Sequence, residues 1–139
     1  MAEGKRCSGI AKAVLKRFRI DNAPVLKYVE AREYYDMAAR AYAAAGKPEF
    51  SGDAYAKCAD MSSRMCRGAT LEAVYFHVRC GELCEENDPT EACEQYADAC
   101  DGCCDLGEWA TAAELRYRIA RLAEFSDDAA GVEDRVGNG

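Results

Sequence analysis

The chain has 139 residues, half of them hydrophobic, and 25 acidic against 18 basic side chains give a formal net charge of −7 at pH 7. This length suits one domain with a single core, and the acidic balance disfavours binding to nucleic acid. No apolar run approaches the roughly 20 residues of a membrane span. The N-terminus also lacks the apolar stretch of a secretory signal peptide. We expect a cytoplasmic protein, although the basic start leaves a transit peptide open.

Residues 1–22 form a basic amphipathic segment, because the first 20 residues carry six Lys or Arg against Glu3 alone. A helix is predicted over 6–20, and its apolar stripe would consist of Ile10, Ala13, Val14, Arg17 and Phe18. This pattern suits either docking on the rest of the protein or peripheral contact with an anionic membrane. We favour docking, because the stripe is short.

Further helices are predicted at 24–45, 51–66, 69–86, 89–105 and 109–125. Pro24 and Pro89 suit first helical positions, and Asp88 can cap the helix that follows it. Glycines at positions 46, 68 and 107 fall where helices should stop. No stretch alternates apolar and polar residues with a period of two, so no sheet is expected. Residues 126–139 are acidic with little apolar surface, which predicts a flexible tail.

One module recurs about every 20 residues between 31 and 125: an aromatic, two residues, then two small residues. Its copies are Tyr35 with Ala38-Ala39, Tyr55 with Cys58-Ala59, His77 with Cys80-Gly81, Tyr96 with Ala99-Cys100, and a degenerate Tyr117 with Ala120. One helix and one turn fill that period, and small residues at a fixed place allow close helix crossings. We therefore predict an all-α domain over 23–125, a solenoid of about six helices stacked as antiparallel hairpins.

Nine cysteines raise the question of metal or redox chemistry. Several occupy the small positions of the module, where Cys behaves as a slightly larger Ala, so reduced core thiols are expected. If the chain held a metal ion, the candidate ligands would be His77, Cys100 and Cys103, which supply only three ligands. His77 is the only histidine, and no catalytic triad or phosphate-binding loop is present, so we predict no enzyme activity and no cofactor. Trp109 is expected in the core or between hairpins.

Three stretches resemble the helical repeats of the soluble NSF attachment proteins, the SNAP family. They are the helix start DPTEA at 88–92, the turn and helix LGEWATAA at 106–113, and the ending RIARLAE at 118–124. Upstream, Glu30-Ala31 with Tyr35 and Tyr42 resembles another helix of the family, and the resemblance covers roughly 28–125. These motifs are also similar to tetratricopeptide-like (TPR) repeats in general.

The resemblance implies a non-catalytic adaptor of vesicle fusion and trafficking, which lies along a SNARE bundle, touches membrane near its N-terminus and recruits the ATPase NSF through its C-terminal end. Binding to an acidic bundle would depend on basic residues on the helical stack. The available ones are Arg40, Lys57, Arg64, Arg79, Arg116, Arg118 and Arg121. The chain has about half the usual number of helices, so the segment that stimulates NSF is expected to be missing. Whether it is complete or a fragment stays open.

Charge is uneven within the predicted domain. No Lys or Arg occurs between Arg79 and Arg116, and that interval holds eleven acidic residues. An acidic middle is a poor match to an acidic SNARE bundle and attracts basic partners. Two other hypotheses therefore stay open: a scaffold subunit that docks on a larger complex by an open end of the stack, and, more remotely, a cysteine-based metal or redox protein.

Overall fold

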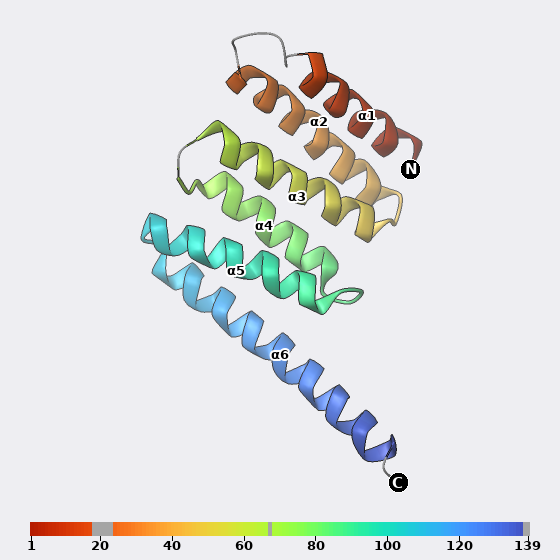
Figure 1. The fold of residues 1–139 in the computed structure, drawn as a ribbon, viewed down its shortest axis with the longest axis vertical. Coiled ribbons are helices and arrows are strands. Elements are labelled where there is room, and N and C mark those ends of the chain that lie inside the picture. Colours follow the sequence, from red (N-terminus) through yellow and green to blue (C-terminus); the bar gives the residue numbers. More distant parts are fainter. Residues whose placement is uncertain (18–23, 67, 138–139) are drawn as a thin grey trace.

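The computed structural model describes the backbone of residues 1–17, 24–66 and 68–137, with side chains for 1–16, 25–66 and 68–125. Six helices occupy these ranges, which contain no strand. They are α1 (Ala2–Arg17), α2 (Pro24–Ala44), α3 (Pro48–Met65), α4 (Leu71–Cys84), α5 (Pro89–Leu106) and α6 (Trp109–Gly137). Each helix lies beside its neighbours in the sequence, and successive helices run in opposite directions (Figure 1). The predicted stack of antiparallel helical hairpins is confirmed.

Local chemistry fixes where these helices begin and end. The Thr70 hydroxyl accepts a 3.1 Å hydrogen bond from Ala73 N at the start of α4, and the Asp88 carboxylate accepts one of 3.1 Å from Glu91 N at the start of α5. Gly107, at φ 75°, adopts the left-handed conformation that ends α5. Pro48 takes the first position of α3, so this helix begins three residues earlier than predicted.

The small pairs of the module lie at the helix crossings, as predicted. All eight residues of the four complete copies are buried. The approach is close enough for side chains to reach the next backbone: Ser51 Oγ donates to Ala39 O at 2.7 Å, and Cys58 Sγ donates to Arg32 O at 3.6 Å. Small polar residues are therefore tolerated there because neighbouring carbonyls accept their protons.

The degenerate fifth copy does not follow this pattern. Tyr117 is 61% exposed and Ala120 is exposed, whereas Ala112 and Leu115 pack α6 against α5. The prediction of Trp109 in the core is also wrong, because its side chain is 66% exposed. Among the described helices, α6 has a neighbour on one side only, which leaves Tyr117 uncovered.

Helix α1 docks on the stack, which confirms the favoured prediction for the basic start. It packs on α2, and its buried residues are Gly4, Cys7, Ala11 and Val14. The predicted stripe is only partly right, because Ile10 is half-buried and Ala13 is exposed; Phe18 and the side chain of Arg17 lie outside the described residues. Small residues decide which side of α1 faces α2, since they let the two helices approach closely.

The predicted helix end near 125 differs from the structure, in which α6 continues to Gly137 and extends beyond the other helices (Figure 1). The sequence over 126–137 holds no proline, and its Ala and Glu residues favour helix. The proposed flexibility of 126–139 stays a prediction.

Replacing Ala39 by Leu should lower the free energy of unfolding by about 1–3 kcal/mol, because Ala39 is fully buried at the α2–α3 crossing and the larger side chain overpacks it. Ala43 on the same helix is exposed, so Ala43→Leu is the matched control and should change stability by less than about 0.5 kcal/mol. Urea unfolding followed by circular dichroism measures both. Equal effects would contradict the assigned crossing.

Gly81→Ala should also destabilise the protein, although alanine favours helix. A Cβ at Gly81 would lie 2.6 Å from the buried ring of Tyr96, and the ring has no room to move. Gly9 on α1 faces open space, so Gly9→Ala should instead raise stability by about 0.5–1 kcal/mol. Thermal melts of the two variants should therefore shift in opposite directions, and a shared direction would contradict the Gly81–Tyr96 contact.

Candidate partner-binding surface

A repeated contact places a cation over the tyrosine of the module. Lys57 Nζ lies 5.6 Å from the ring centroid of Tyr35, and the guanidinium carbon of Arg79 lies 5.7 Å from that of Tyr55. The guanidinium carbon of Arg118 lies 5.7 Å from the Tyr96 ring. In each case the cation belongs to the helix that follows the tyrosine. Such contacts orient a charged side chain at little entropic cost.

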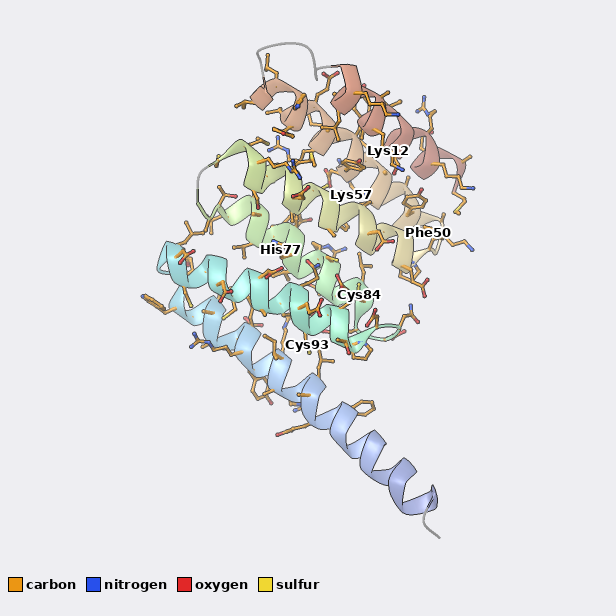
Figure 2. The ribbon with its side chains drawn as sticks, in the orientation of Figure 1. Lys12, Phe50, Lys57, His77, Cys84 and Cys93 are labelled. Carbon is orange, nitrogen blue, oxygen red and sulfur yellow. The ribbon has the colours of Figure 1, made fainter. Side chains whose placement is uncertain are left out.

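The copy on α4 replaces this contact with a neutral one. Its aromatic is His77 on α4 (labelled in Figure 2). The Nδ1 atom of His77 lies 2.8 Å from the Gln95 side-chain oxygen on α5. Gln95 therefore stands where the other copies place a cation.

The contacts fall on two opposite faces of the layer. Tyr55 and Lys57 stand two positions apart on α3, which turns them about 200° around the helix axis. Lys57 therefore points to the face opposite the one on which Arg79 covers Tyr55. Arg79 and Arg118 share a face, because Glu82 lies between them, 3.2 Å from Arg79 and 3.9 Å from Arg118.

We call the surface formed by Arg79, Arg118 and Arg121 the arginine face. It contains an open hollow of about 520 Å³ across α4 and α6, lined by Glu82, Glu85, Tyr117, Arg118, Arg121 and Leu122. Beneath it the Tyr96 hydroxyl donates to Glu85, and burial together with this carboxylate raises the pKa of Tyr96. Arg121 donates to the Tyr117 hydroxyl at 3.1 Å.

Exposed apolar residues border the arginine face on α4. Tyr75 is 51% and Leu71 63% exposed, and the Tyr75 ring lies edge-on to Phe76 at 5.5 Å. Tyr and Arg are the types most enriched among residues that dominate binding energy at protein interfaces. Tyr75 was not among the residues predicted from the sequence. Its position four residues before Arg79, on the same side of a helix, is the signal that could have identified it.

The arginines on this face are already paired, but weakly. Arg79 pairs with Glu82, and Arg118 pairs with Glu114 at 3.4 Å, all with at least a third of each side chain exposed. Exposed ion pairs contribute about 0–1 kcal/mol each, so a partner's carboxylates can replace them at little cost. The face can therefore bind acidic groups without a net positive charge of its own.

The structure does not bring all seven predicted cations together. Lys57 and Arg64 lie on the opposite face, between α2 and α3. Arg40 pairs with Asp36 at 2.8 Å on α2, and Arg116 donates to Cys104 Sγ at 3.6 Å between α5 and α6. Of the seven, Arg79, Arg118 and Arg121 make up the arginine face.

Comparison with known proteins identifies the family. The family model described as soluble NSF attachment protein, SNAP, matches residues 6–133. The chain belongs to the SNAP family. No curated protein and no solved structure matches this SNAP-family chain. The SNAP family is a family of non-catalytic helical adaptors, and membership agrees with the all-α stack. Over the ranges given above, no helix is long and apolar enough to cross a membrane.

Five of the nine cysteines of this SNAP-family chain are buried between helices: Cys7, Cys58, Cys80, Cys100 and Cys103. All nine are free thiols. Burial raises the pKa of Cys58 and of Cys80, which keeps both in the uncharged thiol form that packs against apolar neighbours. Cys100 Sγ donates to Ala112 O at 3.6 Å, across the α5–α6 crossing. Among the described residues, no group of three or more His, Cys, Asp or Glu is arranged to hold a metal ion.

Removal of metal should leave the protein unchanged, because these thiols pack as small core residues. Protein purified with a reductant is expected to contain less than a tenth of an equivalent of zinc, roughly, and to melt at the same temperature with and without a strong chelator. Elemental analysis and thermal melts measure this. About one zinc per chain would contradict the assignment and return attention to His77, Cys100 and Cys103.

Proposed function

We propose that the chain is a SNAP-like adaptor that binds a folded SNARE-type helical bundle, or a comparable helical partner, through the arginine face. The observation that carries this proposal is the convergence of Arg79, Arg118 and Arg121 on one side of the stack, beside exposed Tyr75 and Tyr117. Family membership supplies the class of partner.

The contacts of the arginine face suit a rod-shaped partner with acidic side chains. The three arginines come from α4 and α6, and Arg118 reaches across α5 to Glu82, so the surface spans three helices. Tyrosine rings hold the guanidinium groups of Arg79 and Arg118 in place before binding. Preorganised cations lose less conformational entropy when they meet a carboxylate.

The acidic middle of the chain does not oppose such a partner. Asp98 and Asp105 stand two and nine positions from Tyr96, which turns them roughly 160–200° away from the arginine face. They line a hollow on the other side with His77 and Asp101. The face that would meet an acidic bundle is therefore separated from Asp98, Asp101 and Asp105 by the thickness of the layer, whereas Glu82 and Glu85 lie on it.

A scaffold subunit is the second candidate, and one observation favours it. Helix α6 exposes Trp109, Tyr117 and Phe125 at 66%, 61% and 77%. Large exposed aromatics at the end of a stack suit docking on another protein. In that case the arginine face would be dispensable and α6 would carry the contact.

Arg79→Gln and Arg118→Gln should each weaken binding to a purified, folded SNARE bundle by about five- to tenfold at low salt, because each removes one charge-assisted contact. Arg116→Gln is the matched control outside the arginine face and should change affinity less than about twofold. Biolayer interferometry with the full chain measures all three, and affinity should fall with added salt.

The scaffold role would be favoured if the chain bound no bundle at low salt and was instead stably incorporated into another complex. That incorporation should depend on Trp109. An equal loss for Arg116→Gln would mean that the attraction is general and would contradict the assigned face.

A further inference from the structure

A second basic site lies on the face opposite the arginine face, where α1, α2 and α3 meet. It is a hollow of about 340 Å³ lined by Leu15, Lys27, Tyr28, Tyr35, Lys57, Asp60, Met61 and Arg64. We call it the lysine cleft. In Figure 2, Lys57 lies on α3 beside α2. Three cations and one carboxylate line it, in a chain whose net charge is −7.

The three cations lie over the rings of two tyrosines, Tyr28 and Tyr35. Lys27 Nζ lies 5.1 Å and the guanidinium carbon of Arg64 lies 5.7 Å from the centroid of the same ring, that of Tyr28. Lys57 lies over Tyr35, the next tyrosine on that side of α2. Like charges held round neighbouring rings repel one another, so their shared position favours an anion between them.

The carboxylate of the cleft does not cancel this charge. Asp60 accepts a hydrogen bond of 3.1 Å from Arg64 Nε, one helical turn away on α3. Arg64 also contacts the Tyr28 side chain. A guanidinium carries five N–H donors, so donors remain for a further acceptor, and the two lysine ammonium groups each carry three. Arg and Lys are the side chains that bind phosphate most often, the first through its fork and the second as a point charge.

We propose that the lysine cleft binds an anion that carries two or more phosphate groups, either a small polyphosphate in solution or the phosphorylated headgroup of a lipid. Two centres, one around Tyr28 and one at Lys57, offer a place for more than one phosphate. Leu15, Met61 and the tyrosine rings complete the lining of the cleft. The volume falls in the usual range of small-ligand sites.

This site is independent of the proposed partner-binding function. Lys57 and Arg64 point away from the arginine face, so loss of one activity leaves the other measurable. The cleft also assigns a role to two of the predicted cations that the arginine face leaves out.

Isothermal titration of the full chain with inositol trisphosphate and with inorganic phosphate tests the site in solution. The trisphosphate should bind at least about tenfold more tightly than phosphate, because it engages both centres. Lys57→Gln and Arg64→Gln should each weaken it about tenfold. Lys47→Gln, at the other end of the α2–α3 hairpin, and Arg116→Gln on α6 are the matched controls, and both should bind like the parent chain.

Vesicle sedimentation distinguishes the lipid source. Phosphatidylcholine vesicles containing phosphatidylinositol bisphosphate are compared with vesicles that contain phosphatidylserine at the same surface charge. Preference for the first, lost in Lys57→Gln, assigns a lipid headgroup; binding of the free trisphosphate without that preference assigns a ligand in solution. Circular dichroism melts confirm that each variant is folded.

Three results would overturn the proposal. They are no binding of either probe and no vesicle preference at low salt, full binding by the Lys57→Gln/Arg64→Gln double variant, and equal losses in the two control variants. The last would show attraction by general positive charge and no built site.

Discussion

The close approach of successive helices is the constraint on which the rest of the structure depends. Small residues at each crossing bring one backbone within reach of the next, so Ser51 and Cys58 donate directly to carbonyls of α2 and the Tyr96 ring lies against Gly81. A tyrosine held at such a crossing has no space to turn. Its ring therefore presents a fixed surface, and a cation from the following helix covers it.

This arrangement also separates charge. Helical geometry turns residues two positions apart to opposite sides, so Lys57 and Tyr55, or Asp98 and Tyr96, belong to different faces of one layer. The arginines of α4 and α6 gather on one face, whereas Asp98, Asp101 and Asp105 lie on the other with the lysine cleft. An acidic chain thus offers an arginine face, whose cations are offset by neighbouring glutamates, and a lysine cleft on opposite sides of one layer.

The two ends of the described stack are not equivalent. Helix α1 covers the first crossing with small residues and presents lysines outward, whereas α6 has exposed aromatics and a long extension. The module accounts for this difference, because its copy on α6 would need a further neighbour to bury Tyr117 and Ala120.

The sequence by itself determined the helices, their order, their starts at proline and Asp88, and the buried small pairs, because a period near 20 and the capping residues are local features. It also supplied the family resemblance. It did not determine which of the seven cations share a surface, nor that Tyr75 lies beside Arg79, nor the register of α1. Those facts depend on the rotation of each helix about its axis. Packing against both neighbours fixes that rotation, so only the tertiary structure decided them.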